Sequence, residues 1–116
     1  PQAFYNHLIK FNSTLGHVLI YSPEMSSTQN ICKNLASMNV LPHGSLIVTD
    51  SQISGRGRGS NTWDSPQGCL MFSMNIRVPK NKTHCLVVIQ YVVAMAVVQG
   101  IRNVLHVDDP VHIKIK

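Results

Sequence analysis

The stretch "SLIVTDSQISGRGRGSNTW", residues 45–63, decides the fold, because it joins a strand pattern to a loop of unusual composition. Its first part, residues 45–52, is rich in β-branched side chains, which predicts a β-strand. Glycine and arginine then alternate over residues 55–59, a composition typical of a loop. The sequence therefore predicts a strand that leads into a flexible, positively charged loop.

Upstream of this stretch, the pattern predicts a strand followed by a helix. Residues 17–23, "HVLIYSP", are short, rich in β-formers and closed by Ser22-Pro23, as expected for a strand. A helix over residues 27–38 follows from two signals. Ser26 with Gln29 fits a capping box, and apolar side chains recur at helical spacing, at Ile31, Cys32, Leu35 and Met38.

Downstream, the chain again alternates between strand and helix patterns. Residues 69–78 read as a strand, "PKNK" as a polar connection, and residues 83–105 as a long helix that is apolar on nearly all sides and therefore buried in a core. Residues 111–116, "VHIKIK", alternate strictly, which predicts a half-buried strand. The order β-α-β-loop-β-α-β predicts an α+β fold in which a mixed β-sheet is layered with helices.

Composition limits the class of protein further. A chain of 116 residues with 44% hydrophobic residues is typical of one globular domain or part of one. The net charge of +5 suits an anionic partner, although solubility alone also explains it. The apolar run over residues 86–98 is interrupted by Gln90 and falls short of the about 18 residues that a bilayer requires, so we expect no membrane partner.

Cysteine and histidine usage points away from a disulfide framework or a metal site. Cys32, Cys69 and Cys85 are an odd number at wide spacing inside apolar runs, typical of reduced, buried thiols in an intracellular protein. The six histidines form no pair at metal-ligand spacing, so no metal site is expected. The first ten residues, "PQAFYNHLIK", lack the basic and apolar regions of a signal peptide, and we expect none.

The glycine-arginine loop has the chemistry of an anion-binding site. Gly55, Gly57 and Gly59 let the backbone approach a ligand and turn its N–H groups inward, while Arg56 and Arg58 supply charged groups that match carboxylate and phosphate oxygens. The pattern fits neither the phosphate loop of nucleotide hydrolases nor the dinucleotide fingerprint. A solvated hairpin connection and an RNA-binding Arg-Gly segment remain as alternatives.

A longer motif surrounds this loop and resembles the signature of the biotin protein ligases, which include the holocarboxylase synthetases of eukaryotes. The motif consists of Gly55-Arg56-Gly57-Arg58, Trp63, Ser65-Pro66 and Gly68. Ser27-Thr28 resembles the start of the family's Ser-Thr-Asn motif, Gln52 its biotin-binding glutamine, and Lys116 the lysine of its Lys-Trp-Pro-Asn-Asp motif. The resemblance covers residues from about 17 to 116.

The resemblance implies a fold and an activity. The fold is the biotin/lipoate ligase fold, similar to class II aminoacyl-tRNA synthetases, with residues 1–116 as a truncated, N-terminal part of the catalytic domain. The activity is ATP-dependent activation of biotin to biotinyl-5′-AMP and transfer to a lysine on the biotin carrier domain of a carboxylase. ATP, biotin and Mg²⁺ are the implied small molecules. The implied location is the cytoplasm, or alternatively the mitochondrion, and no nucleic-acid partner is expected.

The resemblance also assigns roles to individual residues. The catalytic residues are Arg56, Arg58 and Lys116. The biotin-binding residues are Ser27, Thr28, Gln29, Gln52, Arg56, Gly57 and Arg58, although Gln29 stands where the family has asparagine, and Asn30 follows it. The nucleotide-binding residues are Gly55, Arg56, Gly57, Arg58, Trp63 and Lys116.

Two other functions remain open. Lipoate ligases and octanoyltransferases share the fold, but they do not carry the glycine-arginine motif followed by tryptophan. A non-catalytic module that binds RNA or an acidic protein through Arg56 and Arg58 would belong to another class, and its affinity would fall steeply with salt.

Overall fold

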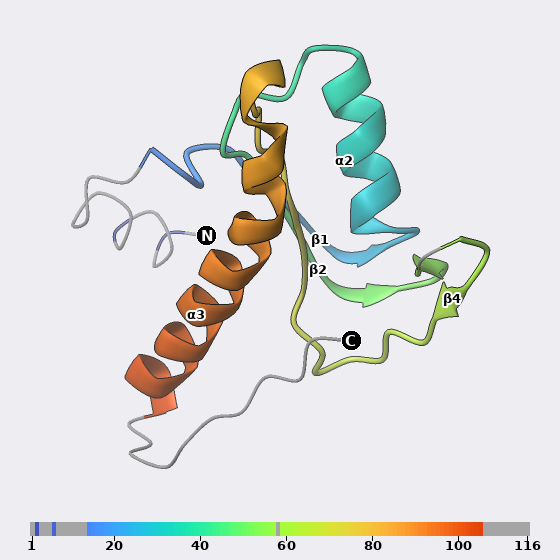
Figure 1. Ribbon diagram of the computed structural model, residues 1–116. Coiled ribbons are helices and arrows are strands. Elements are labelled where there is room, and N and C mark those ends of the chain that lie inside the picture. Colours follow the sequence, from blue (N-terminus) through green and yellow to red (C-terminus); the bar gives the residue numbers. More distant parts are fainter. Residues whose placement is uncertain (1, 3–5, 7–13, 58, 106–116) are drawn as a thin grey trace. The chain divides into compact units, whose positions relative to one another are not determined.

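The computed structural model describes residues 2, 6, 14–57 and 59–105 (Figure 1). The chain divides into two compact units, Pro1–Arg77 and Val78–Lys116, which are described separately below. Residues 111–116, for which a terminal strand is predicted, lie outside the described residues.

The first unit contains a mixed three-stranded sheet, as the sequence predicts. Strand β1 (Leu19–Met25) pairs in parallel with the central strand β2 (Leu46–Gln52), and β2 pairs in antiparallel fashion with β5 (Met71–Met74). The register places Ile20 beside Ile47, and Ile47 beside Ser73. This register carries the carboxyl end of β2, and with it Gln52, toward the start of the helix that follows β1.

Strand β1 is displaced from its predicted range, residues 17–23, and runs through Pro23. The Ser22-Pro23 pair had been expected to end the strand. Among the described strands β1 lies at an edge of the sheet, where proline is tolerated because its nitrogen faces away from the neighbouring strand. The backbone is therefore free to continue to Met25.

Helix α2 (Thr28–Ser37) connects β1 to β2 and confirms the predicted helix. Its N-cap is Ser27, whose Oγ accepts from the backbone N–H of Asn30 at 3.5 Å, so the predicted cap at Ser26 is wrong by one residue. The carbonyl oxygen of Ser26 instead accepts from the backbone N–H of Ser54, at 2.9 Å. Ser26 is thus held by this contact outside the helix, and the extended residue at the helix start is Ser27.

The C-terminus of α2 is closed by a left-handed residue. Asn39 has φ of 57°, and its N–H donates to the carbonyl of Ala36, while the N–H of Val40 donates to the carbonyl of Leu35. This is the Schellman arrangement, in which asparagine can replace the usual glycine. It satisfies two of the carbonyls left open at the helix end and turns the chain back toward β2.

The core of the first unit forms between α2 and the sheet. Its buried residues are Met25, Leu41 and Ile47, and the partly buried side chains packed against them are Ile20, Ile31, Cys32 and Leu35. Ile31, Cys32 and Leu35 belong to the helical period seen in the sequence. Met38, the fourth member of that period, is 68% exposed because it is the C-cap, where the helix has already ended.

The glycine-arginine segment is more regular than the predicted loop. Strand β3 (Gly55–Arg56) pairs in antiparallel fashion with β4 (Thr62–Trp63), with Gly55 opposite Trp63 and Arg56 opposite Thr62. The segment is therefore a short β-hairpin, and the chain between its strands is the true loop. From β4 the chain continues toward β5, which is shorter than the predicted strand over residues 69–78, since it begins at Met71 and ends at Met74.

In the second unit, the predicted long helix is present. A 3₁₀ segment, η1 (Lys80–Cys85), leads into helix α3 (Leu86–Leu105). The predicted burial of this helix is not found, since large apolar side chains such as Val87 and Met95 are more than 60% exposed. Within its own unit η1 is the other described element, and it is too short to cover the helix.

The prediction that this segment is too short to cross a membrane also needs correction. The helical segment Lys80–Val104, made up of η1 and nearly all of α3, is long and apolar enough to cross a membrane, by length and composition. The prediction counted only the apolar run of residues 86–98, which contains Gln90, whereas an average over the longer helix also tolerates later polar residues such as Gln99. Core helices of soluble proteins satisfy the same criterion, so it identifies no membrane segment by itself.

The cysteines are free, as predicted, but they differ in burial. Cys32 is partly buried in the core, and burial raises the pKa of its thiol. Cys69 was expected in the core and is exposed. It lies in the turn that precedes β5, where its N–H donates to the carbonyl of Pro66, so it is not yet part of the strand pattern. Cys85 is partly buried.

Candidate functional site

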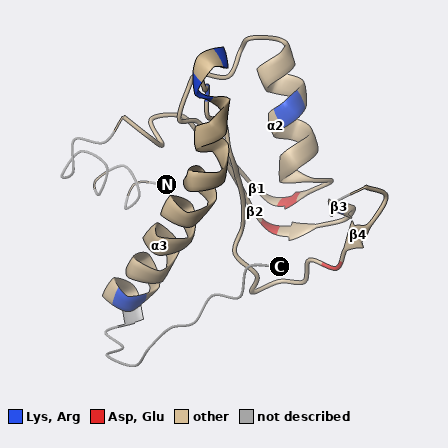
Figure 2. Ribbon diagram, viewed as in Figure 1, with Lys and Arg blue, Asp and Glu red and all other residues tan. Residues whose placement is uncertain are grey.

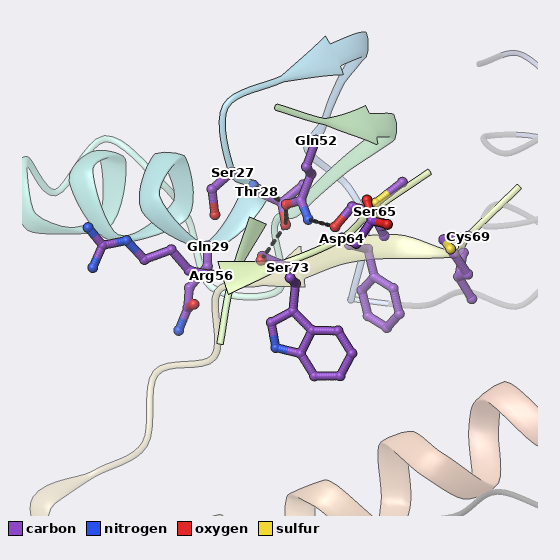
Figure 3. A pocket seen from close by; sticks show the side chains of 13 residues that line it. Ser27, Thr28, Gln29, Gln52, Arg56, Asp64, Ser65, Cys69 and Ser73 are labelled. Atoms are coloured by element: carbon purple, nitrogen blue, oxygen red, sulfur yellow. Dashed lines mark hydrogen bonds between the residues drawn. The ribbon is translucent and has the colours of Figure 1, made fainter. Parts of the chain in front are cut away.

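A cavity of about 510 Å³ opens in the first unit where four elements meet. They are the start of α2, the end of β2, the β3–β4 hairpin and the chain that enters β5 (Figure 3). Of the residues assigned by the resemblance, it brings together Ser27, Thr28, Gln29, Gln52, Arg56 and Trp63. It also includes residues that carried no assignment, namely Asp64, Ser65, Cys69, Leu70, Met71, Phe72 and Ser73.

Thr28 and Gln52 form the centre of a hydrogen-bond network in this cavity. The backbone N–H of Thr28 donates to Gln52 Oε1 at 2.8 Å, and the Thr28 hydroxyl donates to the same oxygen at 3.2 Å. Gln52 Nε2 donates to Ser65 Oγ at 3.1 Å. Gln52, at the end of β2, therefore satisfies a free amide of the first helical turn and fixes its own side chain.

Two serines of this network carried no role in the sequence interpretation. Ser65 is 8% exposed and accepts from Gln52, and Ser73 donates from its hydroxyl to Thr28 Oγ1 at 3.0 Å. Ser65 belongs to the motif that resembles the ligase signature, so the sequence already indicated that it could lie at the site. For Ser73 the signal was weaker: a single hydroxyl inside the otherwise apolar run "CLMFSM".

The first residues of α2 differ in how they face the cavity. The side chains of Ser27 and Thr28 are buried, at 1% and 4% exposure, whereas Gln29 is exposed. Gln29 nevertheless lines the cavity, while Asn30 lines a neighbouring one of about 330 Å³. The residue at the family's asparagine position thus lies at the main cavity, and the asparagine that follows it does not line that cavity.

Arg56 is placed where the two cavities adjoin. Its side chain is exposed and lines the main cavity (Figure 3), and it also lines the neighbouring one. An exposed guanidinium that lines a cavity is suited to hold an anionic group there. The other two predicted catalytic residues, Arg58 and Lys116, lie outside the described residues.

Gly55 and Gly57 are required by close approach. A Cβ on Gly55 would lie 2.7 Å from Ser65 Oγ and 2.8 Å from the Trp63 carbonyl oxygen, and one on Gly57 would lie 2.7 Å from Trp63 Nε1. The Gly57 N–H donates to the carbonyl of Asn61 at 2.8 Å. In this conformation that amide is therefore committed to the hairpin, contrary to the expectation that it turns toward a ligand.

Trp63 is an exposed aromatic at the rim of the cavity. Its exposure is 66%, so it is not a core residue, and its indole ring lies against the backbone of Gly57. The nucleotide-binding role assigned to it stays a prediction. Its exposed ring offers an apolar face on which a flat group can stack.

The charges near the cavity are few and of both signs. Figure 2 shows the Asp and Glu residues of the described chain on β1, on β2 and beside β4. Asp64 is the acidic side chain that lines the cavity, close in the chain to Arg56. Among the described residues no group of three or more His, Cys, Asp or Glu side chains could hold a metal ion.

Comparison with known protein families gives one match over most of the chain. The model of the biotin/lipoate A/B protein ligase family matches residues 21–116. This range includes α2, the hairpin and every element that lines the cavity.

Known relatives match at substantial identity. Biotin–protein ligase 1, chloroplastic, of Arabidopsis thaliana is 43% identical over 89 residues, which cover 77% of this chain and 23% of the relative. The bifunctional ligase/repressor BirA of Bacillus subtilis is 41% identical over 92 residues, which cover 77% of this chain and 27% of BirA. The chain thus spans about a quarter of the length of these relatives.

A solved structure supports the fold. The biotin protein ligase of Leishmania major, determined in complex with biotin, matches with a TM-score of 0.63 and 23% sequence identity. The match covers 79% of this chain and 36% of the Leishmania chain. It confirms the predicted α+β fold with a mixed sheet, and at this identity it carries no more than the fold.

Proposed function

Because the chain belongs to the biotin/lipoate A/B protein ligase family, we propose that it forms part of a biotin–protein ligase and that the 510 Å³ cavity binds biotin. The observation that carries the proposal is the junction of Thr28, Gln52 and Arg56. It places buried hydrogen-bonding groups at one end of the cavity and a permanent positive charge at its mouth. Biotin is complementary to both, because its ring system carries hydrogen-bonding groups and its tail ends in a carboxylate.

The buried end of the cavity suits the ring system. Ser27 and Thr28 supply hydroxyl groups that are almost fully removed from water, Gln52 supplies a partly buried amide, and Met71 and Phe72 line the cavity with apolar surface. Few, fixed polar groups in an apolar pocket are the usual means of orienting a small ligand. A buried polar group without a partner costs about 1 to 3 kcal/mol, so a ligand that lacks matching groups is rejected.

Arg56 suits the first chemical step. A carboxylate oxygen of biotin attacks the α-phosphorus of ATP, an O–P bond forms, the bond to the β-phosphate breaks, and pyrophosphate leaves. The two reactants are anions that repel each other, and the guanidinium of Arg56 offsets this repulsion as charge accumulates on the phosphate. Arg58 is assigned the same role, and Lys116 a contact to the phosphates or the activated carboxyl.

The second step transfers the biotinyl group to a protein. A lysine amine attacks the carbonyl carbon of biotinyl-5′-AMP, the C–N bond forms, the C–O bond to AMP breaks, and the amine loses a proton. The adenylate must be kept from water until that lysine arrives. The β3–β4 hairpin with Trp63 at the cavity rim is placed to cover it.

Magnesium would accompany ATP in the first step. The described cavity offers it one carboxylate, that of Asp64, which fits an ion that is bound by one or two carboxylates together with substrate phosphates. When bound, Mg²⁺ would neutralise phosphate charge.

The proposal is tested by adenylate formation in the full-length protein. Incubation with biotin and ATP should give biotinyl-5′-AMP and pyrophosphate, and Arg56→Gly should lower the amount of enzyme-bound adenylate at least tenfold, the order expected when a charge-stabilising group is lost. Lys33→Ala, on the exposed surface of α2, is the control and should leave adenylate retention unchanged. Undiminished retention in Arg56→Gly would remove the assigned role of that residue.

A lipoate ligase or octanoyltransferase is the second candidate, because the matched family includes both biotin and lipoate enzymes. Lipoate has no polar ring that uses the hydroxyls of Ser27 and Thr28. Competition of lipoate against labelled biotin should therefore require a much higher concentration than competition by unlabelled biotin. Stronger displacement by lipoate would favour this second candidate.

The remaining elements of the proposal concern the whole protein. We infer that residues 1–116 form the N-terminal portion of the catalytic domain and that the acceptor is the biotin carrier domain of a carboxylase. A location in the cytoplasm or the mitochondrion, and the absence of a nucleic-acid partner, are kept as predictions. Labelling of carrier domains in an extract with biotin would identify the acceptor directly.

A further inference from the structure

Ser73 is a polar residue at an unexpected place in the sheet. It lies on β5 between Phe72 and Met74, in register with the fully buried Ile47 of β2. A strand position of this kind is usually apolar, and the flanking residues follow that rule. The hydroxyl of Ser73 is directed to Thr28 Oγ1, at 3.0 Å (Figure 3).

The direction of every hydrogen bond in this network is fixed by one backbone group. The N–H of Thr28 can only donate, so the atom of Gln52 that it meets at 2.8 Å must be the amide oxygen. The Thr28 hydroxyl, 3.2 Å from the same oxygen, must then donate to it. Since a hydroxyl has one hydrogen, Thr28 Oγ1 can only accept from Ser73.

The side-chain hydrogen bonds of this network are therefore all donated in the same direction, from β5 to α2 and from α2 to β2. Ser73 donates to Thr28, Thr28 donates to Gln52, and Gln52 donates through Nε2 to Ser65 at 3.1 Å. Toward the cavity, Thr28 is left as an acceptor, because its hydrogen is already used. Gln52 keeps the second hydrogen of its Nε2 and is left as a donor, because its oxygen already receives two hydrogen bonds.

We propose that Ser73 is a positioning residue for the ligand, which acts by anchoring the Thr28 hydroxyl in place at the cavity while that hydroxyl donates to Gln52. This inference rests on the proposed function, because it concerns the same cavity. It names a residue on β5 that does not belong to the recognised motif. The ligand group selected by this arrangement is one that carries an N–H beside a C=O, such as a cyclic urea or an amide.

Because Ser73 acts through Thr28, loss of the Ser73 hydroxyl should weaken the binding of biotin and leave the binding of ATP unchanged. In the full-length protein, Ser73→Ala should raise the dissociation constant for biotin about fivefold, the effect of one hydrogen bond. The KM for ATP and kcat of adenylate formation should stay unchanged. Ser73→Thr keeps a hydroxyl on the same strand and should restore the affinity for biotin.

A matched control separates this effect from loss of a strand hydroxyl in general. Ser22 lies on β1, does not line the cavity, and donates from its hydroxyl to the carbonyl of Glu24 at 2.8 Å. Ser22→Ala should bind biotin as the unsubstituted protein does. Calorimetric titration with biotin gives the dissociation constants, and urea unfolding of each variant shows whether it is folded.

The outcomes separate this inference from the proposed function. Absence of biotin binding in the unsubstituted protein would overturn the proposed function and the role of Ser73 together. Normal binding of biotin by Ser73→Ala, in a protein that otherwise binds it, would overturn the role of Ser73 alone. A loss that Ser73→Thr does not restore, or an equal rise in the KM for ATP, would also overturn it, because either result indicates a general structural defect.

Discussion

At the scale of single residues, the glycines of the motif are explained by contact more than by freedom of rotation. Gly55 lies on a paired strand with its backbone against Ser65 and Trp63. A side chain at this position would push Ser65, which accepts a hydrogen bond from Gln52, away from the hairpin. The conformational freedom inferred from the sequence therefore applies to the loop between β3 and β4, where Gly59 has φ of 64°.

This reasoning predicts opposite effects for two glycine substitutions. Gly55→Ala should lower the free energy of unfolding by about 1 to 3 kcal/mol, because the new Cβ overlaps Ser65 Oγ and the Trp63 carbonyl oxygen. Gly100→Ala, in α3 with no atom within 4 Å of the added Cβ, should raise it by roughly 0.5 to 1 kcal/mol. Urea unfolding measures both, and equal effects at the two sites would contradict the close-contact explanation.

The more exposed a cysteine is, the faster its thiol should react with an alkylating reagent. Burial raises the pKa of Cys32, which lowers its thiolate fraction at neutral pH, whereas Cys69 is exposed at the cavity. Brief alkylation followed by mass spectrometry should therefore modify Cys69 before Cys32, and saturating biotin should slow the reaction of Cys69. Faster modification of Cys32 in the folded protein would show that the core around it is more open than described.

At the scale of secondary-structure elements, α2 was the easiest to predict and the hairpin the hardest. Helical spacing over Ile31 and Leu35, together with a serine near the start, is a redundant signal, and it located α2 within one residue at each end. The two strands of the hairpin are too short to carry a period. Their pairing brings Gly55 into close contact with Ser65 and Trp63, and the spacing of apolar residues along the sequence does not reveal such a contact.

The start of α2 provides a test at this scale. Ser27→Ala should lower the free energy of unfolding by about 0.5 to 1 kcal/mol, the lower part of the range for N-caps, because the bond to the Asn30 N–H is long at 3.5 Å. Ser26→Ala, at the position that the sequence indicated as the cap, should change it by less than about 0.5 kcal/mol. The reverse order in thermal or urea unfolding would restore the cap to Ser26.

The candidate site was only partly predictable from the sequence. Motif residues such as Thr28 and Gln52 could be assigned because the resemblance is specific, and they do meet in one cavity. The contribution of Ser73 could not, because it follows from the pairing of β5 with β2, a long-range contact. The predicted burial of α3 is not found within its own unit, since composition alone does not state what covers a helix.

At the scale of the whole molecule, binding in the first unit should appear as stability. Biotin at about 100 times its dissociation constant should stabilise the folded protein by about 2.7 kcal/mol, which corresponds to an increase of several degrees in Tm. Lipoate at the same concentration should give a smaller increase. Differential scanning fluorimetry makes the comparison, and an equal increase with both acids would argue against selection by the polar end of the cavity.

The path of β1 through Pro23 has a further consequence, for association between copies of the chain. Strand β1 lies at an edge of the described sheet, and an edge strand exposes backbone groups that can pair with another molecule. Pro23 removes one donor from this row, and an incoming strand would find its ladder interrupted there. The same proline, which lies inside the strand where an end had been predicted, should therefore disfavour pairing of another chain along β1.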